Sequence, residues 1–133
     1  MRVVIDTNVL LSAVLGGALQ AILDHWQDGK FVLVVTDEIV REYLDVLQRP
    51  KFGLRGEVID NIATYLFQFA DFVTPIEHVT VVMADPKDNK FLDAVKVGEI
   101  DYLVSGDRHL LDLKEFQGIF IIAPRVILDQ LGE

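Results

Sequence analysis

Cysteine is absent from this chain of 133 residues, which excludes a disulfide framework and any metal site built on thiolates. No apolar run approaches the roughly 20 residues that a membrane-spanning helix needs. Met1 leads directly into a predicted strand, without the basic and apolar segments of a secretory signal. These features lead us to expect a cytoplasmic protein that does not associate with membranes.

Several familiar catalytic patterns are also missing. The three histidines do not have the spacing of metal ligands, and neither of the common Gly-rich phosphate-binding motifs occurs. Ser12 and Ser105 lack the surroundings of a nucleophile elbow. Carboxylates therefore remain as the main candidates for catalytic groups.

Positive charge is scarce. Lys and Arg together number 12 against 21 Asp and Glu, which gives a net charge of −9. Proteins that bind nucleic acid usually present a basic face. A nucleic-acid partner would therefore require bound cations, a local basic patch or a second chain to offset the repulsion.

The apolar content and its pattern predict an α/β fold. A hydrophobic fraction of 51% excludes a disordered chain, and the length predicts a single domain over residues 1–133. Short β-branched runs alternate with segments of helical periodicity, and such alternation is typical of right-handed βαβ units. We therefore expect three layers, with a parallel sheet that helices cover on both faces.

The same pattern places the individual elements. Strands are predicted over residues 2–6, 31–35, 71–74, 102–105 and 119–122. One helix follows the first strand directly and breaks at Gly16 and Gly17, and the others are predicted over residues 18–28, 37–47, 58–69, 88–97 and 126–131.

Acidic residues recur near the ends of the predicted strands. Asp6 ends the first strand and Asp107 follows the fourth, and the carboxyl ends of parallel strands share the edge where α/β sheets bind ligands. Asp88 opens a helix in an acidic loop that also contains Asp85. Glu42 borders the apolar stripe of its helix, so its side chain is expected to lean over the sheet.

Each acid taken alone has an ordinary explanation. Asp6, Asp88 and Asp107 could be helix N-caps, and Glu42 could be a solvated helix carboxylate. Their recurrence at strand ends favours a shared site instead. Clustered carboxylates repel one another unless a cation joins them, and oxygen ligands select Mg²⁺ or Mn²⁺. This arrangement predicts metal-dependent phosphoryl chemistry.

Two other functions are compatible with the acids. Asp6 could be the nucleophile of a phosphatase, although Asn8 stands where such enzymes have a second acid. The domain could also be a non-catalytic module that binds a metal or a partner protein. Phosphate trapped on Asp6 would favour the phosphatase, and metal binding without turnover would favour the binding module.

The chain resembles the PIN-domain family of metal-dependent nucleases over essentially its whole length, and most closely the toxins of prokaryotic toxin–antitoxin pairs. The matching segments, in order, are residues 4–10, 36–47, 85–92 and 102–111. The resemblance implies a parallel sheet of order 3-2-1-4-5 and cleavage of single-stranded RNA. It also implies a homodimer and a small antitoxin protein as partners.

The resemblance also assigns roles to residues. The catalytic and metal-binding acids would be Asp6, Glu42, Asp88 and Asp107, with Asp85 as the alternative to Asp88. Asn8 would support the first acid, and Ser105 supplies the hydroxyl where the family usually has Thr.

The implied mechanism uses one or two Mg²⁺ ions held by these acids, with Glu42 placing a water molecule or a second metal. Three basic residues flank the acids and are candidates for contacting the RNA backbone: Lys87, Lys90 and Arg108. The aromatic residues of segment 58–72 exceed what one buried helix face needs, which makes this segment a candidate surface for self-association.

Overall fold

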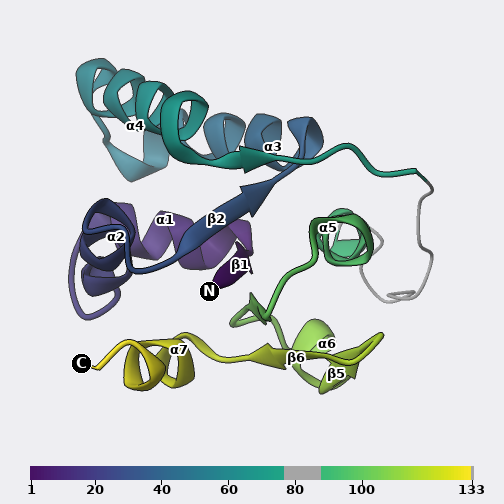
Figure 1. Cartoon of the computed structure of the whole chain (residues 1–133). Coiled ribbons are helices and arrows are strands. Elements are labelled where there is room, and N and C mark those ends of the chain that lie inside the picture. The colour runs from purple at the N-terminus through teal and green to yellow at the C-terminus, as the bar shows by residue number, and fades with distance from the viewer. Residues whose placement is uncertain (77–87, 133) are drawn as a thin grey trace.

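The computed structural model describes residues 1–76 and 88–132, and Figure 1 shows a sheet with helices packed around it. Within those residues the sheet has six strands in the order β3-β2-β1-β4-β6-β5. All neighbouring strands are parallel except β5 and β6. The strands are β1 Arg2–Ile5, β2 Val32–Val35, β3 Asp71–Phe72, β4 Tyr102–Val104, β5 Glu115–Phe116 and β6 Ile119–Ile122. The predicted α/β class is therefore confirmed.

The order 3-2-1-4-5 is correct for the five strands expected from the sequence, the last of which is β6. The prediction missed β5, an antiparallel strand at the edge of the sheet. A tight turn joins β5 to β6, and both of its central residues, Gln117 and Gly118, have positive φ angles of 51° and 83°. A strand of two residues is too short to produce a recognisable alternation of apolar and polar residues.

The helices also follow the prediction closely. They are α1 Thr7–Leu15, α2 Gln20–Gln27, α3 Asp37–Leu47, α4 Gly56–Phe69, α5 Asn89–Gly98, α6 Arg108–Leu111 and α7 Pro124–Gln130. Helix α3 has its predicted bounds, because Thr36 caps it by accepting a hydrogen bond from the amide of Ile39 at 3.1 Å. The four-residue helix α6 and the 3₁₀ turn Pro50–Phe52 were not predicted, since both are too short to show helical periodicity.

Two predicted boundaries have clear structural causes. Helix α1 ends at Gly16, which has a φ of 98°, as expected for a break at this position. Strand β3 was predicted over residues 71–74 but ends at Phe72. Its neighbour β2 ends at Val35, because Thr36 already caps α3, so the ladder extends only one further bond, from the amide of Val73 to the carbonyl of Val35.

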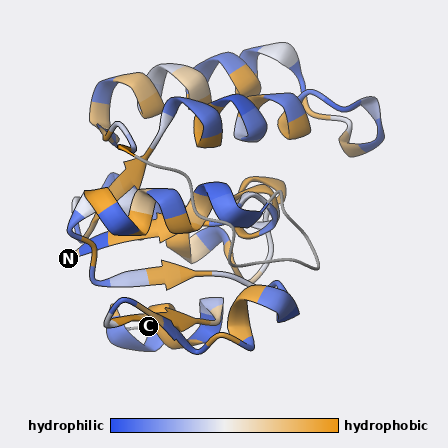
Figure 2. Cartoon of the chain, turned by 90° about the vertical axis from the view of Figure 1, so that its right-hand side faces the viewer, coloured by the Kyte–Doolittle hydropathy of each residue, from blue (hydrophilic) through white to orange (hydrophobic). Residues whose placement is uncertain are grey.

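The central strands form the middle of the hydrophobic core. Val3, Val4 and Leu103 are fully buried, and Figure 2 shows the strands mostly in orange between helices that carry blue outer faces. Helix α5 packs against β1 and β2. Gly98 permits this close approach, since a Cβ atom there would lie 2.9 Å from Cγ1 of Val34.

Figure 1 shows α3 and α4 beside the β3 edge of the sheet, and α7 near the opposite edge. Among the described residues, no single helix is long and apolar enough to cross a membrane. Helices α1 and α2 meet that test only as a pair, and they are bent by 93° relative to each other.

Candidate active site

A pocket of about 190 Å³ opens where β1 and β4 end. The four acids that the sequence singled out all line it, although they come from different segments of the chain. The lining residues are Asp6, Thr7, Asn8, Glu42, Val46, Arg49, Asp88, Phe91 and Asp107. The tertiary structure therefore brings the predicted acids together at one edge of the sheet.

Asp6 lies at the floor of this pocket, with only 3% of its surface exposed. It is the N-cap of α1: its Oδ1 atom accepts a hydrogen bond from the amide of Val9 at 2.8 Å. Its Oδ2 atom accepts a hydrogen bond from the hydroxyl of Ser105. Burial raises the pKa of the Asp6 carboxyl above its usual value, because removal from water penalises the charged form more than these hydrogen bonds favour it.

The register of the sheet explains how Ser105 reaches Asp6. Ile5 pairs with Val104 across the parallel strands β1 and β4, so the next residue of each strand lies side by side. Ser105 is fully buried, and its hydroxyl oxygen also accepts a hydrogen bond from the amide of Asp107 at 2.9 Å. One buried hydroxyl thus links the two strand ends and both of their acids.

Asp107 both caps a helix and lines the pocket. Its Oδ1 atom accepts a hydrogen bond from the amide of His109 at 2.7 Å, which makes Asp107 the N-cap of α6. The cap uses one carboxylate oxygen, and the residue also lines the pocket. Asp6 and Asp107 therefore each cap a helix and also line the same pocket.

Glu42 reaches the pocket from α3, and a neighbouring residue fixes that helix. The buried hydroxyl of Tyr43 donates a hydrogen bond to the carbonyl oxygen of Ile5, the residue before Asp6. This bond ties α3 to the end of β1 and so sets the position of Glu42 relative to Asp6. Burial, together with the nearby charges of Asp6 and Glu42, raises the pKa of the Tyr43 hydroxyl well above its usual value, which keeps it a donor.

Both carboxylate oxygens of Glu42 accept hydrogen bonds from neighbouring side chains. Oε2 accepts one from the hydroxyl of Thr7, the first residue of α1. Oε1 lies 2.7 Å from Nζ of Lys90, in the first turn of α5. Only 10% of the Lys90 side chain and 25% of the Glu42 side chain are exposed, so this ion pair is largely shielded from water. Glu38, one turn earlier on α3, is exposed.

Asp88 immediately precedes α5 and lines the pocket with Phe91 of that helix. In the described structure its side chain does not accept a capping hydrogen bond from α5, unlike Asp6 and Asp107 at their helices. Asp85 and Lys87, predicted as an alternative ligand and an RNA contact, lie outside the described residues. The roles assigned to all these residues stay predictions.

The supporting and basic candidates occupy different environments. Asn8 is exposed at the rim of the pocket, whereas Ser105 is buried beneath it. Arg108 is exposed at the start of α6. Lys90 lies against Glu42, and its role as a contact for RNA stays a prediction.

The sequence did not single out three residues that shape this site. Thr7 lines the pocket and binds Glu42, and Arg49, just after α3, adds a positive charge to the pocket wall. Tyr43 belongs to the buried face of α3, and its hydroxyl bond to β1 was not predicted. These roles depend on contacts between separate elements, and nothing in the local sequence pattern indicates them.

The donor set suits a hard divalent cation. Carboxylate oxygens are the preferred ligands of Mg²⁺ and Mn²⁺, and four carboxylates line one pocket. Within residues 1–76 and 88–132, however, no three acids are already arranged as a ligand cluster. Asp6, Glu42 and Asp107 accept hydrogen bonds from protein donors instead. Side-chain rotation toward the cation would be needed to bind it.

The fold and the pocket define an α/β protein with an acidic site at the carboxyl ends of its parallel strands. The sequence profile of the PIN domain matches residues 2–109, which covers most of the chain. The chain therefore belongs to the PIN-domain family, which is generally a nuclease fold whose members typically bind divalent metals. No curated protein matches the sequence.

Proposed function

We propose that this PIN domain is a Mg²⁺- or Mn²⁺-dependent endoribonuclease that cleaves single-stranded RNA. The observation that carries the proposal is the convergence of Asp6, Glu42, Asp88 and Asp107 on one pocket at the carboxyl edge of a parallel sheet. Membership of a family that is generally nucleolytic supports the same activity.

Asp6, Asp88 and Asp107 are the proposed metal ligands, because they lie around the ends of β1 and β4 and the start of α5. A bound divalent ion lowers the pKa of water and stabilises negative charge on a phosphate. The buried Asp6 has the most to gain from such an ion, since its charged form is otherwise penalised by desolvation. Attack of water on the phosphodiester would leave a 5′-phosphate and a 3′-hydroxyl.

The acidic surface makes RNA binding the most demanding step, since the net charge is −9. Arg49 in the pocket wall and Arg108 beside Asp107 are the described cations best placed to contact the phosphates. Single-stranded RNA is favoured over a duplex, because a flexible strand can bend a single phosphate toward a recessed pocket.

We further propose that the nuclease is the toxin of a toxin–antitoxin pair, which acts as a homodimer and is neutralised by a small antitoxin protein. The support for this assignment is the resemblance of its motifs to those of such toxins. Inducible expression in a bacterial host would test it: the parent should arrest growth, and Asp6→Asn should not. Growth at the normal rate with the active parent nuclease would contradict the toxin assignment.

The nuclease activity itself can be tested with purified protein and a labelled single-stranded RNA. Cleavage should require Mg²⁺ or Mn²⁺ and stop with chelator. Asp6→Asn should slow it by a factor on the order of 10²–10³, because the substitution removes a charge from the proposed metal site while keeping the side-chain shape.

A matched pair on α3 controls for general effects of removing an acid. Glu42→Gln should reduce cleavage strongly, whereas Glu38→Gln, one turn away and exposed, should cleave like the parent. If Asp6→Asn cleaves RNA as fast as the parent, or if chelator has no effect, the proposed activity is wrong.

A further inference from the structure

The ion pair between Lys90 and Glu42 places a positive charge directly beside the acidic pocket. Nζ of Lys90 lies 2.7 Å from Oε1 of Glu42, and the same ammonium lies 5.7 Å from the ring centroid of Phe91. Glu42 and Phe91 line the pocket, and the Lys90 side chain beside them is only 10% exposed, so the ammonium is shielded from water next to the pocket.

The surroundings of Glu42 make this pair hard to separate. Its other oxygen accepts the hydroxyl hydrogen bond of Thr7, so the carboxylate is held from two elements, α1 and α5. Separating a shielded, charge-assisted pair leaves one or both charges poorly solvated, which is strongly unfavourable. For Glu42 to coordinate a metal ion through Oε1, the ammonium of Lys90 would have to be displaced.

An ammonium and a divalent cation compete for the same place on a carboxylate. Two cations within a few ångströms repel each other, and the repulsion is larger where water is excluded. A divalent ion bound directly to Glu42 would therefore meet both an occupied oxygen and a like charge. Asp6 and Asp107, the acids around the other side of the pocket, accept hydrogen bonds from hydroxyl and amide donors, which carry no net charge.

We propose that Lys90 is the resident cation of Glu42, so that the pocket binds one divalent ion beside the aspartates and not a pair of ions. This inference rests on the proposed metal-dependent nuclease. It makes Lys90 a positioning residue that holds Glu42 away from the metal, which differs from the RNA contact expected from the sequence. It also sets the metal stoichiometry, which the sequence left open at one or two.

Titration of metal-free protein with Mn²⁺ provides a readout that is independent of cleavage. Free Mn²⁺ is measured by its electron paramagnetic resonance signal, and the number bound per chain is counted. The parent should bind one ion. Lys90→Met, which keeps the length of the side chain without its charge, should bind two. Lys90→Arg should bind one, because the positive charge beside Glu42 is kept.

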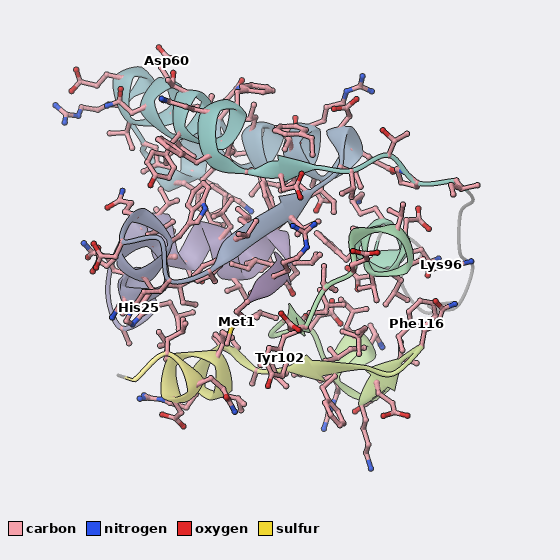
Figure 3. All side chains as sticks on the ribbon, in the orientation of Figure 1. Met1, His25, Asp60, Lys96, Tyr102 and Phe116 are labelled. Atoms are coloured by element: carbon pink, nitrogen blue, oxygen red, sulfur yellow. The ribbon has the colours of Figure 1, made fainter. Side chains whose placement is uncertain are left out.

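Lys96→Met is the matched control, since Lys96 lies on the same helix (Figure 3) but lines a separate pocket with Asp93. It loses the same charge and should still bind one ion. Two ions bound by the parent, or one ion bound by Lys90→Met with unchanged affinity, would overturn the inference while leaving the nuclease proposal intact. A parent that binds no Mn²⁺ would overturn both proposals.

A double variant tests the same point even if Lys90→Met does not fold. Glu42→Gln combined with Lys90→Met removes the ion pair without changing the net charge of the pocket. If Glu42 is not a ligand, this double variant should bind one Mn²⁺ with the affinity of the parent. Loss of affinity by more than about tenfold, the scale of a lost metal-site contact, would show that Glu42 binds the metal and would overturn the inference.

Discussion

Asp6 and Glu42 line the same pocket, but their charges are accommodated in different ways. Asp6 is almost fully buried and accepts hydrogen bonds from neutral groups, the hydroxyl of Ser105 and the amide of Val9. Glu42 is partly exposed and pairs directly with the ammonium of Lys90. The pKa of Asp6 is raised because hydrogen bonds from neutral donors only partly replace lost hydration.

This contrast divides the pocket into two sides with different tasks. On the Asp6 side, the negative charge has no cationic partner among the described hydrogen-bond donors, and a divalent cation would stabilise it. On the Glu42 side, the ammonium of Lys90 already pairs with the carboxylate. Such a division would suit the proposed site, which binds one metal ion while a second carboxylate keeps a fixed orientation. Substitutions that remove one donor from each side can test whether the two sides are in fact independent.

The largest effect is expected for Ser105→Ala. It removes the hydroxyl that donates to Asp6 and leaves the amide of Asp107 without that acceptor, at a fully buried position. The free energy of unfolding should fall by about 1–3 kcal/mol, measured by urea denaturation in chelator. Ser105→Thr retains the hydroxyl and should lose less. Equal losses in the two variants would show that side-chain shape, and not the hydroxyl, matters here.

An intermediate effect is expected from pH. The folded-state pKa of Asp6 is raised, so between the unfolded and folded values the native protein holds a proton that the unfolded chain has lost. Asp6 therefore makes the metal-free protein progressively less stable as pH rises through that interval.

The comparison with Asp6→Asn isolates this contribution, because Asn cannot ionise. The free energy of unfolding of both proteins is measured in chelator at a series of pH values. As pH increases from acid to neutral, the parent should lose stability relative to Asp6→Asn, until the variant is the more stable of the two. Added Mn²⁺ should stabilise the parent, by about 2.7 kcal/mol at one hundred times its dissociation constant, and not the variant. A constant difference between the two proteins at all pH values would contradict the raised pKa.

The smallest effect is expected for Thr7→Val on the other side of the pocket. It removes the hydroxyl that donates to Oε2 of Glu42, while Lys90 still holds Oε1. Glu42 is partly exposed, so water can replace the lost donor, and the cost should be only about 0.5–1.5 kcal/mol. Mn²⁺ affinity should equal that of the parent. A clear loss of Mn²⁺ affinity in Thr7→Val would show that the two sides are coupled.

Local patterns account for most of the secondary structure. The apolar runs of β1 and β2 and the periodic stripe of α3 are long enough to be recognised, and the N-cap at Thr36 fixes where that helix begins. The edge strand β5 and the helix α6 were missed because each contains too few residues for a period to show. Their positions depend on the turn at Gly118 and on the capping carboxylate of Asp107.

The residue types of the candidate site could also be predicted. An acid directly after an apolar strand, such as Asp6, is recognisable in sequence, and a carboxylate at the edge of an apolar stripe, such as Glu42, is recognisable on a helix. Their partners could not be predicted, because Lys90 and Glu42 are 48 residues apart and Thr7 and Glu42 are 35 apart. Side-chain contacts over such separations depend on how the helices pack.

The sequence by itself determined the α/β class and the acids at the strand ends, because both follow from local hydrophobic period and the shared direction of parallel strands. The central order of the sheet was expected only from the resemblance to the PIN-domain family. Only the tertiary structure decided how each acid is held. The register of β1 and β4 sets Ser105 against Asp6, and the packing of α5 beside α3 sets Lys90 against Glu42. Burial and charge pairing depend on surroundings in three dimensions, which no local stretch of sequence specifies.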